Sequence, residues 1–376
     1  MPKKREEGEA PRAGVGERAI IRLIEERFMC ANSQVIVGLG DDAAVLRQTG
    51  AAGAAAGTGP ADLIATSDLL VEGVHFRLDW MSLADAGYKA LAANISDIAA
   101  MGGLPRYALG AVGVPHGTSG AEIEALLDGV AEAAGPCGVA LIGGDTVAAP
   151  QWILGFTVLG ETTGRALKRS GASPGDNLWH SGALGLSETG LHVLCGGLDP
   201  ARFPASVSAH RRPSPQVALG QWLQREGLAS ACLDTSDSLA QCALLLAEAS
   251  GVGLRLDFTG YAFDEEVARF AAAQRNHMAQ EAALTVAGTL DPQGKSRSYQ
   301  SLAEYVLGSS EDFQLLFTAA PAATPALLRY GASNNPGTSL TKLGMIVDAA
   351  EGCHYLDELG QEQPLKPIGF QHLTEE

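Results

Sequence analysis

Two acidic residues stand inside apolar patterns, and they are the first residues whose type and place could do chemistry. Asp68 lies within the apolar run Leu63–Val71, and Asp97 lies in a segment whose apolar residues have helical spacing. Thr66 shares a strand face with Asp68, and Asn94 shares a helix face with Asp97. A buried carboxylate needs a cation or hydrogen-bond donors. We predict that Asp68 and Asp97 face one site and hold a divalent metal; the alternative is two structural acids with ordinary partners.

The elements that must position these acids are a strand, a short polar loop and a helix. Leu63–Val71 is aliphatic or β-branched at its flanks and polar at its centre, which a buried strand accepts only where something binds. Glu72–Phe76 forms the loop. Apolar residues then recur at helical spacing through Asp85–Met101, until Gly102-Gly103 and Pro105 end the pattern.

Further acids follow glycine, serine or threonine at the ends of other apolar runs. They are Asp41 and Asp42 after Gly40, Asp145 after Gly143-Gly144, and Asp234 and Asp237 around Thr235-Ser236. Each alone fits a turn or a cap, with Ser236 or Asp237 as the N-cap of the next helix. Together they fit several Mg²⁺ ions around a polyphosphate, because hard cations bind carboxylate oxygen and bridge to phosphates.

The sequence does not have a phosphate-binding P-loop to accompany these acids. The nearest match, Gly288–Ser296, has five residues between its glycines where a P-loop has four, and one of them is Pro292. Proline has no amide hydrogen to offer a phosphate. The acids therefore indicate metal-assisted phosphoryl transfer without a P-loop.

Composition sets the class of protein. The chain has 376 residues, 46% of them hydrophobic, and a mean hydropathy of +0.07, which suit two packed globular domains. No apolar run approaches the roughly 20 residues that span a bilayer, and the N-terminus lacks the apolar core of a signal peptide, so we predict a cytoplasmic protein without a membrane partner. The net charge of −17 argues against a nucleic-acid partner. Six cysteines without a Cys-x-x-Cys pair signal neither a zinc site nor disulfides.

We predict an α+β chain with a flexible tail at 1–13, a metal-binding domain at 14–162, and an α+β domain at 163–376. The first half is expected to hold strands at 35–46, 63–71, 107–114, 139–147 and 152–161 and helices at 16–29, 85–101 and 120–134. The second half is expected to hold helices near 187–196, 215–226, 237–249 and 321–330 and strands near 177–181, 230–234, 253–257, 313–318 and 340–347. The Gly/Ala-rich stretch Thr49–Ala61 fits a flexible hairpin tip.

Seven runs, in order along the chain, resemble the thiamine-monophosphate kinases, a family related to aminoimidazole ribonucleotide synthetase and selenophosphate synthetase. The runs are Gly40-Asp41-Asp42, Thr66-Ser67-Asp68 with Val71–Phe76, Asn94–Gly102, Gly143–Thr146, Arg169–Asp176, Arg212–Pro215 and Asp234–Asp237. The resemblance extends from about residue 16 to Phe370. It implies direct, Mg²⁺-assisted transfer of the γ-phosphoryl group of ATP to thiamine monophosphate, which gives thiamine diphosphate.

The resemblance also implies a fold and a set of site residues. The fold would be an N-terminal sheet domain that forms a barrel across a homodimer, followed by an α+β domain. The implied Mg²⁺ ligands are Asp41, Thr66, Ser67, Asp68, Asp97, Asp145, Asp234 and Asp237. The implied ATP contacts are Gly144, Asp145, Arg169 and Ser236, and the implied contacts of thiamine monophosphate are His75, Glu311 and Phe370.

The chain departs from the family pattern at a few positions. Ser238 and Ser309-Ser310 stand where the family usually has glycine, and Leu186 stands where it has an acid. These departures keep two alternatives open: a homologue that binds nucleotide or thiamine phosphate with weak turnover, or a sister ATP-dependent synthetase with another substrate. A selenophosphate synthetase would need a reactive cysteine near a glycine-rich N-terminal segment, whereas Cys30 lies in an apolar, helix-like context.

Overall fold

The computed structural model describes residues 20, 21, 24, 26, 27, 32–48, 61–162, 164–281, 299–333 and 339–368. Residues 20, 21, 24, 26 and 27 are helical, in agreement with the helix predicted at 16–29. The predicted tail, residues 49–60 of the Gly/Ala-rich stretch, the P-loop near-match, Cys30 and Phe370 lie outside the described residues.

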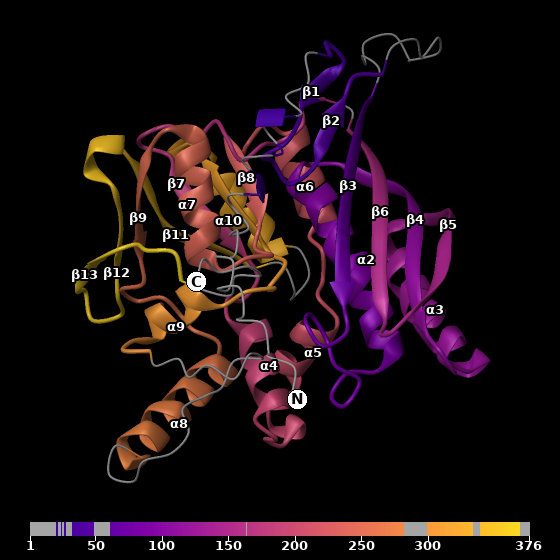
Figure 1. Ribbon diagram of the computed structural model, residues 1–376. Coiled ribbons are helices and arrows are strands. Elements are labelled where there is room, and N and C mark those ends of the chain that lie inside the picture. The colour runs from indigo at the N-terminus through magenta and orange to yellow at the C-terminus, as the bar shows by residue number, and fades with distance from the viewer. Residues whose placement is uncertain are drawn as a thin grey trace, which may run out of the picture.

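The first half of the chain forms a six-stranded sheet (Figure 1). Its strands, in spatial order, are β1 (Val35–Val37), β2 (Ala44–Leu46), β3 (Asp62–Val71), β6 (Ile153–Thr162), β4 (Leu104–Pro115) and β5 (Ala140–Ala149). Neighbouring strands are antiparallel except β4 and β5, which are parallel. β5 is therefore an edge strand, and the sheet is open within one chain.

The second half forms a seven-stranded mixed sheet, which lies beside the first sheet in Figure 1. Its spatial order is β13 (Glu362–Pro364), β12 (Cys353–Leu356), β9 (Gly253–Asp257), β11 (Leu340–Val347), β7 (Asn177–Ser181), β10 (Leu315–Ala319) and β8 (Ala231–Asp234). Its helices are α4 (Leu186–Cys195), α5 (Pro204–Arg211), α6 (Val217–Arg225), α7 (Leu239–Ser250), α8 (Glu265–Glu281), α9 (Leu302–Gly308) and α10 (Thr324–Ser333). Short 3₁₀ turns lie at Gly135–Cys137, Pro200–Arg202, Pro321–Ala323 and Ala349–Glu351. The two sheets with their helices confirm the α+β class.

Helix α2 (Leu83–Ala100) is the element that joins the two halves. It packs against β3 and β6 on one side, against α3 (Gly120–Ala134) on another, and against α6 and β8 of the second half. Fifteen of its 18 residues are buried as a result. The buried polar residues of α2, which are Lys89, Asn94, Ser96 and Asp97, therefore must find partners within the protein.

The predicted elements of the described residues are confirmed, with boundaries that shift by a few residues. The sequence analysis did not predict α5, α8, α9, β12 or β13. β12 and β13 have four and three residues, which is too short for a period to show. None of the helices in the described ranges combines the length and apolar content that a bilayer crossing requires.

Candidate active site

Three carboxylates from distant parts of the chain meet between the two sheets. Asp42 precedes β2, Asp97 lies on α2, and Asp234 ends β8. One oxygen atom from each lies within 4.8 Å of the other two. Within the described residues, Oδ2 of Asp42 and Oδ1 of Asp234 are buried and have no hydrogen-bond partner. This acid cluster therefore offers carboxylate oxygens as ligands for a divalent cation, and two of these oxygens have no hydrogen bond that the cation would have to replace.

Hydroxyl and amide groups orient the cluster. Oγ1 of Thr66 donates to Oδ2 of Asp97 at 2.6 Å, and Oγ of Ser96 donates to Oδ2 of Asp234 at 2.6 Å. The backbone N–H of Asp68 donates to Oδ1 of Asn94 at 3.0 Å. Each bond involves a residue of α2, so the burial of that helix fixes the geometry of the cluster.

Burial makes the cluster costly to ionise without a cation. It raises the pKa of Asp42 to about 8, although Arg169 opposes the shift. Burial also raises the pKa of Asp234 to about 6, against hydrogen bonds from Ser96 and Ser236. Burial, with Asp234 and Asp68 nearby, raises the pKa of Asp97 well above its usual range. Because carboxylates this close repel one another when charged, a bound divalent metal would favour their ionised forms.

Arg169 closes one side of the cluster. Its Nε and Nη2 donate to Oδ1 of Asp42 at 3.0 and 2.6 Å, and its backbone N–H donates to both oxygens of Asp41 at 3.2 and 3.3 Å. Burial alone would lower the pKa of Arg169, but Asp42 and Asp41 raise it, so this side chain stays cationic. Arg169 thus connects the Gly40-Asp41-Asp42 run to the start of the second half. Of the two adjacent acids, Asp42 belongs to the cluster, and Asp41 accepts the backbone N–H of Arg169.

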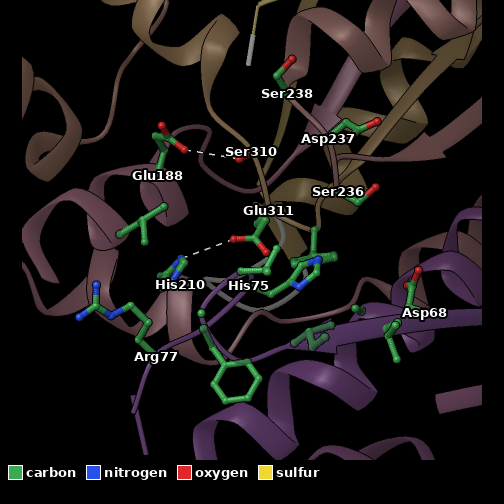
Figure 2. A pocket seen from close by; sticks show the side chains of 18 of the residues that line it. Asp68, His75, Arg77, Glu188, His210, Ser236, Asp237, Ser238, Ser310 and Glu311 are labelled. Carbon is green, nitrogen blue, oxygen red and sulfur yellow. Dashed lines mark hydrogen bonds and ion pairs between the residues drawn. The ribbon is translucent and has the colours of Figure 1, made fainter. Parts of the chain in front are cut away.

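A cavity of about 250 Å³, shown in Figure 2, has Asp68 and Ser236 in its wall. Both residues interact with members of the acid cluster, so the cavity lies next to it. Asp68, Ser236 and Asp237 line one side of it, which we term the metal end. Glu188 and His210 lie across the cavity from Asp68, and we term this side, with Glu311 and Lys89, the substrate end.

Glu311 is held at the substrate end by a strained loop. Its φ of 58° lies in the left-handed region, which costs an L-residue roughly 1–2 kcal/mol. The loop is fixed by its contact with the Asp234–Asp237 run, since the N–H of Glu311 donates to the carbonyl of Ser236 at 3.0 Å. Nζ of Lys89, a residue only 1% exposed on α2, donates to Oε2 of Glu311 at 2.9 Å. An ion pair between the two halves of the chain thus fixes the position of the Glu311 carboxylate.

His210 and His75 complete the surroundings of Glu311. Nδ1 of His210 lies 3.8 Å from Oε2 of Glu311, and burial, with Lys89 nearby, lowers the pKa of His210 well below its usual range. His210 is therefore neutral near pH 7. Nδ1 of His75 accepts the N–H of Val71 at 3.0 Å, so the proton of its neutral ring lies on Nε2.

Of the acids expected as metal ligands, Asp97 and Asp234 belong to the cluster. Asp68 lies beside it on the cavity wall, whereas Ser67 and Asp145 lie away from it within one chain. Ser67 points to the other face of β3, where its hydroxyl bonds the carbonyl of Phe156 at 3.2 Å. The strand register places Asp145 on that same face, in one row with Ala111, Gly155 and Leu69. Asp145 lies three strands from β3, or about 14 Å at the usual strand spacing.

Gly144, an expected ATP contact, has a structural reason to be glycine. A Cβ there would lie 1.8 Å from the carbonyl oxygen of Gly110, so only glycine lets β5 approach β4 this closely. Its place next to Asp145 puts it on the same edge strand, away from the acid cluster of its own chain.

The serine residues that stand where the family has glycine all have hydrogen-bond partners for their hydroxyl groups. Ser238 is the N-cap of α7, where its Oγ accepts the N–H of Gln241 at 3.2 Å. The alternative that Ser236 or Asp237 is simply the N-cap of this helix therefore does not hold; both line the cavity, as Ser238 also does. Oγ of Ser309 donates to the carbonyl of Tyr305 at 3.0 Å, and Oγ of Ser310 donates to Oε2 of Glu188 at 3.4 Å.

The sequence analysis grouped Asp42 with the acids that fit Mg²⁺, but the resemblance selected only its neighbour Asp41 as a ligand. Lys89, Glu188 and His210 were not selected as site residues. Asp42 was visible as an acid beside Asp41, and Lys89 as a cation in the middle of an apolar helix. His210 lies on α5, a helix that was not predicted. Glu188 lies in the first turn of α4, where an acid is explained by the helix dipole alone.

Comparison with known proteins identifies first the class and then the family. Residues 40–162 match the family model "AIR synthase related protein, N-terminal domain", so the first sheet is of that class. The thiamine-monophosphate kinase of Mycobacterium tuberculosis (strain CDC 1551 / Oshkosh) is 37% identical over 260 residues, 69% of this chain and 74% of that protein. That of Escherichia coli O157:H7 is 31% identical over 96% of this chain and 98% of that protein. The chain belongs to the thiamine-monophosphate kinase family.

Solved structures agree over almost the whole chain. The structure described as "AaThiL complexed with AMPPCP and TMP" has a TM-score of 0.73 and 27% identity, and the match covers 95% of this chain and 97% of that one. Thiamine-monophosphate kinase from Stenotrophomonas maltophilia K279a has a TM-score of 0.65 and 30% identity, with coverage of 91% and 97%.

Proposed function

We propose that this protein transfers the γ-phosphoryl group of ATP directly to thiamine monophosphate and so forms thiamine diphosphate. The observation that carries the proposal is the acid cluster of Asp42, Asp97 and Asp234 beside a cavity whose far side has a separate binding surface. Family membership supports it, as does the solved relative that holds AMPPCP and TMP together.

The acid cluster fits Mg²⁺, because it offers carboxylate oxygens, two of which lack hydrogen-bond donors within the described residues. Bound Mg²⁺ would neutralise phosphate charge and bring two anionic reactants together. We propose Asp42, Asp68, Asp97 and Asp234 as the ligands that one chain supplies at this cluster. The roles expected from the resemblance for Asp41, Thr66 and Asp237 stay predictions.

The protein's own groups would do the positioning. Arg169 is a buried, permanently cationic group at the cluster, placed to contact ATP phosphates, and Ser236 lies on the cavity wall next to Asp234. Glu311 and His75 would hold the heterocyclic part of thiamine monophosphate away from the metal end. A covalent enzyme intermediate is not needed, since in-line transfer requires alignment and charge neutralisation.

We also propose a homodimer in which the first sheets of two copies pair. Nine of the ten residues of β5 are exposed, and large apolar side chains lie bare on β3, β4 and β5. These are Leu69, Tyr107, Leu109, Leu141, Ile142 and Val147, each at least 39% exposed. A second copy that pairs with this edge of the sheet would cover these side chains and close the edge of β5, and it would bring its own Gly144 and Asp145 towards Ser67.

The dimer is tested by the variant Val147→Asp, which places a charge on a side chain that is 56% exposed in the single chain. We expect sedimentation velocity to show a dimer for the unchanged protein and a folded, inactive monomer for the variant. If either the unchanged protein or the variant is a fully active monomer, the proposed dimer is refuted. The domain boundary near residue 162, the contact from Phe370 and the cytoplasmic location likewise remain predictions.

The reaction itself is tested by incubating the purified protein with ATP, Mg²⁺ and thiamine monophosphate and separating the products by chromatography, with unphosphorylated thiamine as the control acceptor. Thiamine diphosphate from the monophosphate alone is the expected result. Measurable ATP binding without product would favour a binding homologue, and product from another acceptor would favour a sister synthetase.

A further inference from the structure

The loop that carries Glu311 has a strained backbone on both sides of Asp312. Glu311 has a φ of 58° and Phe313 has a φ of 48°, and both lie in the left-handed region that bulky L-residues rarely adopt. Within the described ranges, every other residue with a positive φ is a glycine. Strained backbone of this kind persists only where the surrounding structure holds it, and it is concentrated at functional sites. The contacts of this loop therefore show what keeps Glu311 in place.

Two backbone hydrogen bonds tie the loop to the metal end of the cavity. The N–H of Glu311 donates to the carbonyl of Ser236 at 3.0 Å, and the N–H of Phe313 donates to the carbonyl of Thr235 at 3.1 Å. Glu311, labelled in Figure 2, and Phe313 line the cavity, whereas Asp312 between them is not part of its wall. Asp312 can therefore affect a bound substrate only through its neighbours.

The side chain of Asp312 ties the same loop to α4. Asp312 is 9% exposed; its Oδ2 accepts the N–H of Gly185 at 2.6 Å, and its Oδ1 accepts the N–H of Ser187 at 3.0 Å. Gly185 is the N-cap of α4 and has no side chain that could satisfy these N–H groups. Because the N-terminus of a helix favours an anion, the carboxylate of Asp312 both caps α4 and anchors the loop.

We propose that Asp312 is a positioning residue: by anchoring the strained loop to α4, it places Glu311 for contact with thiamine monophosphate. This inference rests on the proposed function. Lys89 holds the carboxylate of Glu311, and Asp312 holds the backbone that carries it. The two supports come from different elements, α2 and α4. Without the second, the backbone at Glu311 relaxes out of the left-handed region and turns the carboxylate away from the cavity.

The first test is Asp312→Asn, which keeps one acceptor oxygen and replaces the other with an N–H donor. Binding of thiamine monophosphate and of ATP with Mg²⁺ is measured by calorimetry, each without the other ligand. The measurements are made at about pH 8, because burial raises the pKa of Asp312 to about 7. We expect about fivefold weaker binding of thiamine monophosphate and less than about twofold change for ATP.

Asp257→Asn is the matched control. Asp257 is 7% exposed, and its Oδ1 accepts the N–H groups of Leu359 and Gln361 at 2.9 and 2.8 Å, but it does not line the cavity. Its replacement also removes a buried, hydrogen-bonded charge, so it measures the effect of lost stability alone, and we expect less than about twofold change in binding. Thermal melting checks folding. If Asp312→Asn does not fold, Asp312→Glu, which keeps the charge but displaces it, should show the same selective loss.

A double variant shows whether Asp312 acts through Glu311. In the background of Glu311→Gln, Asp312→Asn should weaken binding of thiamine monophosphate by less than about twofold, because the carboxylate that Asp312 places is already gone. An undiminished loss in that background would mean that Asp312 acts by another route, which overturns the inference. Equal losses for thiamine monophosphate and ATP, or no loss for either, would overturn it as well.

Hydrogen exchange gives a readout that needs no substrate. Asp312→Asn should speed exchange at the amides of Glu311, Phe313 and Ser187, whereas Asp257→Asn should leave them unchanged. Unchanged exchange in Asp312→Asn would show that Asp312 does not hold the loop and would overturn the inference. If the unchanged protein neither binds nor converts thiamine monophosphate, the proposed function fails, and the exchange result still decides whether Asp312 holds the loop.

Discussion

The two ends of the cavity hold their charges in opposite ways. At the metal end, three carboxylates share one nearby cationic side chain, Arg169, and two of their oxygens have no hydrogen-bond donor within the described residues. At the substrate end, Glu311 is already matched by Lys89. The metal end is thus completed by what it binds, whereas the substrate end is largely formed in advance. Removing a side chain at the metal end should therefore lower metal binding and turnover, whereas removing one at the substrate end should lower the stability of the fold.

The largest expected effect is at the metal end. Asp97→Asn should lower kcat by roughly 100-fold or more, because it removes one ligand of a site worth several kcal/mol of charge stabilisation. The fold should survive, since the raised pKa of Asp97 means that the metal-free protein already tolerates a neutral group there. Steady-state kinetics and thermal melting measure the two properties. Asp128→Asn, exposed on α3, is the matched control, and full activity of Asp97→Asn would end the metal-site argument.

The second effect separates the substrate end from the metal end. Lys89→Met keeps most of the side-chain volume but leaves Glu311, whose side chain is 25% exposed, without its cation, and we expect this to cost roughly 1–3 kcal/mol. We expect this loss in chemical denaturation, together with a higher KM for thiamine monophosphate and an unchanged KM for ATP.

The pairing itself is checked by a double variant. Lys89→Met combined with Glu311→Gln should recover part of the lost stability, because no unpaired charge remains. If the double variant is as unstable as the sum of the two single variants, Lys89 and Glu311 act independently and the substrate end is not preformed by their pair.

This contrast also explains how far the sequence could predict the site. At the metal end, Asp97 was predicted as an acid inside an apolar helix and Asp234 as an acid at the end of an apolar run, and both signals are local in the sequence. Most helices and strands could be predicted for the same reason, because the spacing of apolar residues is also a local signal. At the substrate end the signal is not local: Lys89 meets Glu311 across 222 residues of sequence, and a lysine on a helix usually faces solvent. Only the burial of α2 between the two halves, a property of the assembled fold, makes Lys89 part of the site.

A smaller effect is expected from pH at the metal end. The raised pKa values of Asp42, about 8, and Asp234, about 6, mean that the metal-free folded state binds protons that the unfolded state releases. Their contribution to stability is present below about pH 4 and is lost as the pH rises towards about 8. The melting temperature in EDTA should therefore fall over this range, and added Mg²⁺ should raise it more at the alkaline end. A stabilisation by Mg²⁺ that is independent of pH would contradict proton displacement, and Asp42→Asn should flatten the profile.

The smallest effect concerns the serines that replace the family's glycines. Ser238 lines the cavity, but its hydroxyl is used within the chain: it accepts the N–H of Gln241 as the N-cap of α7 and donates to the carbonyl of Ile368. If the two ends work as described, it takes no part in binding. Ser238→Gly should cost only about 0.3 kcal/mol and Ser238→Ala about 1 kcal/mol, as for other helix caps, with kcat changed less than about twofold in both. Chemical denaturation and steady-state kinetics measure the two effects. A large gain in activity for Ser238→Gly would instead mean that the hydroxyl obstructs the cavity, and the substrate end would then be formed only after that serine is removed.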